Sequence, residues 1–313
     1  MLQSRLASVH VLVLSAICLL AIPAFAGAQN SSANGSITTV VTALGPNYTA
    51  PPNITKDDIS VYSKQAKLNV TSWEPAKGGS QLQLAILIDD AVSPRAIGMQ
   101  FNDLKDFIEQ QPAGTEVGLF YARYGSFTTA AKFSTDHQQV AGKLHLTFGR
   151  RSGSSPSIYL SLSDLAKKWP GNPEAARREV LVLTSGMDLL EPGVQDPYFD
   201  AAVTNVQKYG VIVHSIYIGP LRLGLSFFGM IAQSNLGQLT SQSGGDAFFE
   251  GISTPVSFKP FLNQLDTILR NQYVVSFESP NGAKPGRLMP IDIRVEQKNV
   301  KLLYPHHVLV PGK

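Results

Sequence analysis

Residues 81–89 read QLQLAILID, a nearly continuous apolar run that ends in an acid. A strand with one buried face would alternate apolar and polar side chains, whereas this run is typical of a strand buried on both faces. Burial on both faces requires that helices cover each side of the sheet. The segment therefore predicts a layered α/β fold.

Strand-like and helix-like segments alternate from this run to about residue 270. Further strands are expected at residues 117–123, 127–133, 179–184, 211–218 and 247–249, and helices at 94–111, 157–169, 198–209, 231–243 and 258–269. Short connections in this order require crossovers between parallel strands. The expected fold class is therefore α/β, with a doubly wound, mostly parallel sheet of the Rossmann-like kind.

Short β segments flank this region on both sides, separated by turns rich in Gly, Pro and Asn. The N-terminal set is too short to be stable alone, so we expect both sets to pack together as one accessory β module. The expected bounds are 37–79 for the N-terminal β segment, 80–271 for the α/β domain and 272–313 for the C-terminal β segment.

Residues 1–28 have the organisation of a secretory signal peptide. Arg5 supplies a positive charge, residues 11–22 form an apolar run, and small residues after Pro23 offer cleavage sites. The run is short for a membrane span. We therefore expect cleavage, a flexible polar leader at 29–36, no membrane span afterwards, and a secreted or periplasmic protein. The alternative is a signal kept as an anchor.

Composition argues against several classes of function. Cys18, the only cysteine, lies within the signal, so the mature chain has no thiolate for metal binding or catalysis. The net charge is only +3, and basic doublets such as Arg177-Arg178 are scattered, which indicates solvated surface and no nucleic-acid partner. Residues 153–157 lack the glycine of a hydrolase nucleophile turn, and no phosphate-binding loop is present. We therefore expect no enzyme activity.

Several short motifs lie in a recognisable order. Residues 89–93 (DDAVS) and 183–186 (LTSG) follow buried strands, and 244–249 (GGDAFF) precede the last amphipathic helix. Together they resemble the von Willebrand factor A domain, and more closely the secreted bacterial VWFA-related proteins. In that family an early β segment carries a Lys-Asp-Asp signature, which 55–62 (TKDDISVY) match. The resemblance covers roughly residues 37–312.

The resemblance raises the question of a metal ion. Family members with metal-dependent adhesion hold Mg²⁺ through an Asp-x-Ser-x-Ser loop, a Thr and a second Asp. Asp89 and Ser93 match this set, but Ala91 replaces the first serine and Ser185 the second aspartate. The threonine position falls on Ser155 or on the proline after it. Because Mg²⁺ demands six oxygens in octahedral geometry, we expect no functional site and no cofactor.

The function that the resemblance implies is binding of an unknown protein ligand, for adhesion or as a scaffold. The alternative is an Mg²⁺- or Mn²⁺-dependent adhesin with a degenerate site built from Asp89, Ser93, Ser155 and Asp188. Residues 221–230 (LRLGLSFFGM) form an apolar loop that would pack against the β module or recognise a partner. The candidate ligand-loop residues are Asp90, Ser185, Leu221, Phe227 and Phe228.

Overall fold

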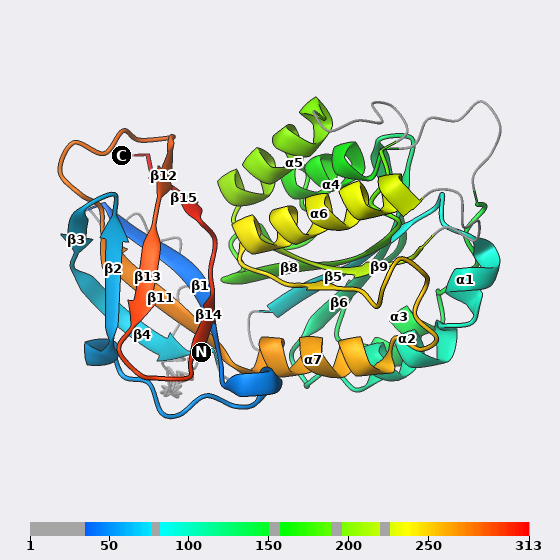
Figure 1. Ribbon diagram of the computed structural model, residues 1–313, viewed down its shortest axis with the longest axis horizontal. Helices are drawn as coiled ribbons and strands as arrows, with labels where there is room; N and C mark the ends of the chain where they lie inside the picture. Colours follow the sequence, from blue (N-terminus) through cyan, green and yellow to red (C-terminus); the bar gives the residue numbers. More distant parts are fainter. Residues whose placement is uncertain (1–34, 77–81, 150–156, 189–195, 220–225, 313) are drawn as a thin grey trace, which may run out of the picture.

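The computed structural model describes residues 35–76, 82–149, 157–188, 196–219 and 226–312. The expected signal peptide and most of the expected leader lie outside these ranges. An α/β body and a smaller β module lie side by side (Figure 1). Among the described residues, no helix has both the length and the apolar content needed to cross a membrane.

A six-stranded sheet forms the middle of the α/β body. Its strands are β5 (Leu82–Asp89), β6 (Glu116–Arg123), β7 (Ser126–Ser134), β8 (Arg177–Thr184), β9 (Val211–Tyr217) and β10 (Ala247–Phe248). They lie in the order β10-β9-β8-β5-β6-β7, and every pair is parallel except β6 and β7. All eight residues of β5 are buried, which confirms the strand expected from its apolar run.

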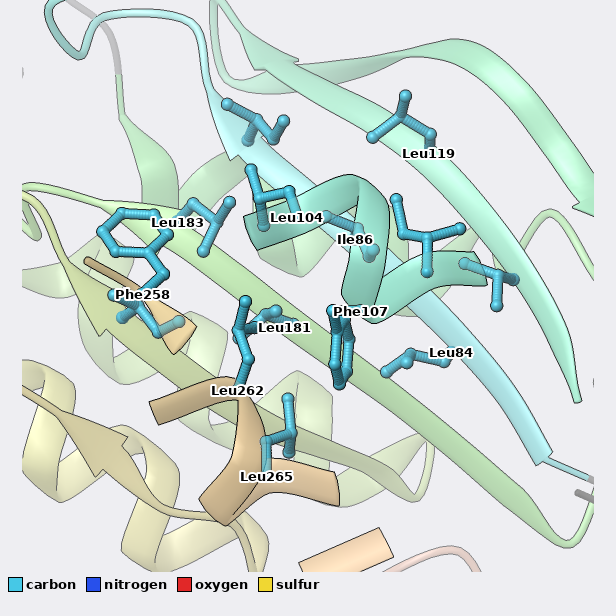
Figure 2. Close-up of a cluster of buried hydrophobic side chains, with 14 of the residues drawn as sticks. Leu84, Ile86, Leu104, Phe107, Leu119, Leu181, Leu183, Phe258, Leu262 and Leu265 are labelled. Carbon is cyan, nitrogen blue, oxygen red and sulfur yellow. The ribbon is translucent and has the colours of Figure 1, made fainter. Parts of the chain in front are cut away.

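Helices cover both faces of this sheet (Figure 1). They are α1 (Pro94–Gly98), α2 (Phe101–Glu109), α3 (His137–Ala141), α4 (Ile158–Lys167), α5 (Pro197–Lys208), α6 (Ser226–Ser243) and α7 (Lys259–Arg270). α4 and α5 bury their apolar faces on one side of the sheet, together with Leu239 of α6. On the other side, Phe107 of α2 and Leu262 of α7 pack near Leu84 and Ile86 of β5 (Figure 2). The doubly wound fold class is confirmed.

The single helix expected at residues 94–111 is wrong, because the structure divides it into α1 and α2. The buried side chain of Gln100 lies at the break and bonds to the loop before α7. Its Nε2 donates to the carbonyls of Pro255 (3.3 Å) and Val256 (3.2 Å), and its Oε1 accepts from the Phe258 N–H (3.0 Å). These contacts join residues about 155 positions apart, so the local sequence pattern could not predict the break.

The β module combines strands from both ends of the chain. Its elements are β1 (Ser36–Leu44), β2 (Ile59–Ser63), β3 (Ala66–Leu68), β4 (Val70–Pro75), β11 (Gln272–Glu278), β12 (Leu288–Pro290), β13 (Asp292–Val295), β14 (Lys301–Leu303) and β15 (His307–Leu309), with 3-10 turns η1 (Pro46–Tyr48) and η2 (Lys56–Asp58). One sheet has the order β14-β1-β11-β4 and another β13-β2-β3. Because β1 pairs with β11 and β2 with β13, the two terminal segments form one unit, as expected.

The Lys-Asp-Asp signature forms η2 and closes it as a capping box. The Asp58 carboxylate accepts from the backbone N–H and from the hydroxyl of Thr55, both at 2.7 Å. This reciprocal arrangement satisfies donors that the turn would otherwise leave free. These bonds lower the pKa of the Asp58 carboxyl.

The basic doublet at the start of β8 is not solvated surface, so that prediction is wrong. Arg177 is 1% exposed and Arg178 is 8% exposed. Arg177 Nε donates to Oε1 of Gln272 (2.7 Å), and its Nη2 donates to the Leu269 carbonyl (2.6 Å). The strand begins two residues earlier than expected, and the chain entering β11 covers its amino end.

Arg177 belongs to a buried polar network that joins the sheet to the β module. Glu179 lies with one carboxylate oxygen 4.0 Å from Arg177 Nε, and its other oxygen accepts from His214 Nε2 at 2.9 Å. His214 Nδ1 accepts from the Asp246 N–H (3.2 Å), which places the ring proton on Nε2. His214 is therefore a satisfied core residue, as expected from its place in a strand.

Replacing Arg177 with methionine tests this network. Arg177→Met leaves the fully buried Glu179 carboxylate without its cation, so the free energy of unfolding should fall by about 3–5 kcal/mol. Urea denaturation measures the loss. The matched control is Arg270→Met on α7, where the arginine pairs with Asp266 at an exposed position and little change is expected. Equal losses in both variants would contradict the network's role.

Candidate functional site

The candidate site lies at the carboxyl ends of the parallel strands, on the side of the sheet away from the β module (Figure 1). Asp89 ends β5, Arg123 ends β6 and Thr184 ends β8. Doubly wound sheets generally place binding sites at this edge, because the loops of neighbouring strands converge there. The structure therefore brings the acidic loop after β5 beside the loops that follow β6 and β8.

Asp89 is buried, and both of its carboxylate oxygens hold donors from the protein itself. Thr184 Oγ1 donates to Oδ2 at 2.7 Å, and the Ala91 N–H donates to Oδ1 at 3.0 Å. Burial raises the pKa of the Asp89 carboxyl above its ordinary value of 3.8, and these two hydrogen bonds oppose that rise. The nearby charges of Asp90 and Asp188 raise the pKa further.

Asp90 is held by the loop before residue 150 and by a cation from β6. Its Oδ1 accepts from the Phe148 N–H (2.9 Å), and its Oδ2 pairs with Arg123 Nε (3.0 Å). The Arg123 guanidinium lies over the Phe148 ring, 4.3 Å from its centroid, and 5.7 Å from that of Tyr124. Sequence reasoning missed Arg123, since a lone arginine at a strand end carries no pattern that assigns it a partner.

Two of the other predicted residues, Ser93 and Asp188, form local hydrogen bonds. Ser93 caps α1, with Oγ 3.4 Å from the Ala96 nitrogen. Asp188 is buried and accepts a hydrogen bond from the Ser157 hydroxyl at the start of α4. Ser185 is half-buried in the loop after β8. Ser155 and Leu221 lie outside the described residues, so the structure does not place them.

The groups around Asp89 and Asp90 fit an octahedral Mg²⁺ site poorly. Ala91 contributes a backbone N–H where an oxygen would be needed, and the Asp89 and Asp90 carboxylates already accept hydrogen bonds or pair with Arg123. A cation entering here would have to displace donors with which each acid is already satisfied. Within the described ranges, no group of three or more His, Cys, Asp or Glu side chains is arranged to hold a metal ion.

Exposed apolar side chains gather at this same edge of the sheet. Among the described residues, ten large hydrophobic side chains are exposed. Eight of them lie in segments that directly follow the parallel strands β5, β6, β9 and β10, and the other two, Leu146 and Phe148, lie beside the segment that follows β5. The ten are Met99, Tyr124, Leu146, Phe148, Phe227, Phe228, Met230, Phe249, Ile252 and Val256. We call this set the edge patch.

The apolar loop expected at residues 221–230 is in part a helix. Residues 226–230 form the first turn of α6, and Phe227, Phe228 and Met230 are exposed there. This end of α6 lies away from the β module (Figure 1). Packing against the β module is therefore the wrong explanation for the described part of this segment.

The hydroxyl of Thr184 provides a test of the Asp89 environment. Thr184→Val keeps the side-chain shape but removes a donor from a buried carboxylate, so stability should fall by about 1–3 kcal/mol near neutral pH. The Asp89 carboxyl has a pKa in the folded protein above its ordinary value of 3.8, so the folded state becomes less stable as the pH rises above 3.8. Losing the Thr184 donor raises this pKa further. The loss should therefore shrink as the pH falls toward 3.8.

The matched control for this experiment is Thr147→Val. Thr147 is also buried, but its hydroxyl donates to the neutral carbonyl of Val92 at 2.9 Å. The stability loss of this control should not depend on pH in the same range. Denaturant titrations at several pH values measure both. A pH-independent loss for Thr184→Val would show that Asp89 does not titrate as described.

Comparisons with known proteins give likenesses of fold. No protein-family model matches the chain, and no curated protein matches it in sequence. Proximal thread matrix protein 1 of the mussel byssus is 15% identical over 65% of this chain and 48% of its own, with a TM-score of 0.47. The pilus adhesin SpaC of Lactobacillus rhamnosus GG is 11% identical over 84% and 49%, with a TM-score of 0.46.

A further solved structure, the VWA domain of SpRpn10, is 15% identical over 58% of this chain and 94% of its own, with a TM-score of 0.36. At these identities and scores the likeness concerns the fold alone, so the assignment rests on this chain's own sheet order, crossovers and strand-end loops. Residues 82–270 form a doubly wound α/β domain, and the motifs at its strand ends are those that resemble the von Willebrand factor A domain, so we call it the A-like domain.

Proposed function

We propose that the A-like domain is a protein-binding module, for adhesion or as a scaffold, and that it binds its ligand through the edge patch without a metal ion. The observation that carries this proposal is the confinement of the ten exposed large hydrophobic side chains to one edge of the sheet. Soluble proteins rarely gather apolar side chains in this way unless the surface meets a partner. Export to the periplasm or the exterior, and the absence of a catalytic role, belong to the same proposal.

Two residues of the edge patch are of the types that dominate protein interfaces. Tyr124 is 64% exposed and Phe148 is 53% exposed, and both rings lie against the Arg123 guanidinium. Aromatic residues and arginine contribute most of the binding energy in many interfaces. The ion pair with Asp90 holds the Arg123 guanidinium in place, so the two rings are arranged before a ligand binds. Less conformational entropy is then lost on binding.

The charge balance at this edge also favours an apolar ligand surface. Arg123 neutralises Asp90, and the raised pKa of the Asp89 carboxyl disfavours its charged form. The Asp90 carboxylate is therefore already paired and does not serve as an open partner for a cationic ligand group.

The Mg²⁺- or Mn²⁺-dependent adhesin is the second candidate. One observation favours it: Asp89, Asp90 and Asp188 lie close enough that the charges of the other two raise the pKa of the Asp89 carboxyl. A divalent cation would relieve that repulsion. The candidate requires Arg123 and Thr184 to release their carboxylate partners, so its test is direct measurement of ion binding.

Calorimetric titration with Mg²⁺ and with Mn²⁺ separates the two candidates. We expect no binding heat at about millimolar ion, because the acids already hold protein donors and Mg²⁺ gives up its waters reluctantly. Asp89→Asn, which removes the charge of the central acid, is the control. Saturable heat in the wild type that disappears in Asp89→Asn would establish the adhesin instead.

Capture of ligands from envelope extract or culture fluid tests the edge patch. Phe148→Ser and Tyr124→Ser should each reduce the captured protein by about tenfold, as expected for aromatic side chains that contribute strongly to an interface. The matched control is Tyr62→Ser in the β module, where Arg294 lies 4.7 Å from the ring centroid in the same kind of stack. Quantitative mass spectrometry and binding assays with the captured protein provide the measurement.

Two outcomes of the capture experiment would overturn the proposal. The first is equal capture by the wild type and by Phe148→Ser, which would place the ligand elsewhere. The second is loss of capture when a chelator is added, which would make a metal ion part of the interface. Capture that survives the chelator and the Tyr62→Ser change, but not Phe148→Ser, supports the proposal.

A further inference from the structure

A second candidate site lies at the opposite end of the sheet, in a cavity of about 80 Å³ where the A-like domain meets the β module. Its lining comes from β1, from the starts of β8 and β9, from the end of α5 and from residues 305–309. Among the described residues that line it, Arg178, Lys208 and His307 are basic, and none is an aspartate or a glutamate. The positive charges of Arg178 and Lys208 are therefore not balanced by any carboxylate in this lining.

Arg178 is the unusual group in this lining. Its side chain is 8% exposed, yet no hydrogen bond or ion pair joins its guanidinium to another residue that the structure describes. Burial lowers the pKa of this guanidinium, and among the described residues the charge of Glu174 opposes that change. A guanidinium carries five N–H donors, and no Arg178 nitrogen is among the fully buried side-chain atoms without a partner, so its unpaired donors remain accessible from the cavity that it lines. Arg177, in contrast, donates to Gln272 and to a carbonyl.

The surroundings of Arg178 leave room for a ligand. Nη2 lies beside Gly210, where an added Cβ atom would be 3.3 Å away, so the glycine keeps space next to the guanidinium. Lys208 is exposed at the end of α5, which gives the cavity a basic residue on its solvent side. Nδ1 of His307 lies 3.4 Å from Nε2 of Gln207, an amide donor, which leaves the other ring nitrogen to carry a proton.

We propose that this cavity binds one small oxyanion, a phosphate or carboxylate group, with Arg178 as the principal donor and Lys208 as a second charge. A planar guanidinium fork matches the oxygens of either group and forms charge-assisted hydrogen bonds with them. An anion held there would contact both the A-like domain and the β module. Its binding would therefore stabilise the junction between them.

Another source of compensation for Arg178 is the carboxyl end of α5, where the helix dipole is negative. In that case Arg178 would be stabilised by the helix end and by water, and the cavity would show no anion affinity. The two explanations differ in what a titration measures, because only the proposed site saturates with one anion per chain.

The experiment is calorimetric titration of the full chain with sodium phosphate and, in a second arm, with sodium acetate, at constant ionic strength. The two arms distinguish phosphate from carboxylate as the preferred group. Arg178→Gln should weaken binding by at least about tenfold, since it removes the charge-assisted donor. Lys208→Gln should weaken it by a smaller factor. Lys105→Gln, at an exposed position on α2 remote from the cavity, is the matched control and should bind as the wild type does.

Lys208→Gln keeps the test decisive if Arg178→Gln does not fold, because its side chain lies at an exposed position. Phosphate also stabilises proteins nonspecifically, so the increase in melting temperature is compared between Lys208→Gln and Lys105→Gln. Saturable one-to-one binding, reduced by the cavity variants alone, supports the proposal. No saturable binding of either anion to the wild type, or equal binding by the wild type and Lys208→Gln, overturns it.

Discussion

Two adjacent carboxylates end a strand that is buried on both faces, and the protein has to compensate their charge where water has little access. Asp89 receives the Thr184 hydroxyl and the Ala91 N–H, and Asp90 receives Arg123 and the Phe148 N–H. These bonds join β5 to the ends of β6 and β8 and to the loop before residue 150. The position of every group in the candidate site depends on them, because buried acids without donors would not be tolerated.

At the amino end of the sheet, the buried charge that has to be compensated is positive. Arg177 lies at the start of β8 and donates hydrogen bonds to Gln272 and to the end of α7. Glu179 and His214 pair with each other in the same network. The network holds the β module at this end of the sheet, and the β module does not cover the carboxyl end (Figure 1). The exposed aromatic side chains lie at that free end, so the fold separates the junction with the β module from the proposed ligand-binding surface.

The sequence predicted those parts of the fold that depend on local periodicity. The apolar run of β5, the helical stripes and the alternation between them were sufficient for the doubly wound sheet, and the short β segments for one module made from both ends of the chain. Local periodicity could not predict contacts between distant residues. Gln100 lies where a helix is divided and bonds near residue 255, and Arg177 is buried by a strand almost 100 positions later. In the site, the motif located Asp89 and Asp90, but the cation beside Asp90 came from Arg123, a residue without a motif.

We propose that protein donors, and not a divalent cation, compensate the Asp89 and Asp90 carboxylates. A crystal structure of the chain soaked in Mn²⁺, with anomalous scattering data, tests it most directly. We expect no anomalous peak within coordination distance of Asp89, with Arg123 still in contact with Asp90 and Thr184 still bonded to Asp89. A peak surrounded by six oxygens beside Asp89, with Arg123 displaced from Asp90, would contradict it.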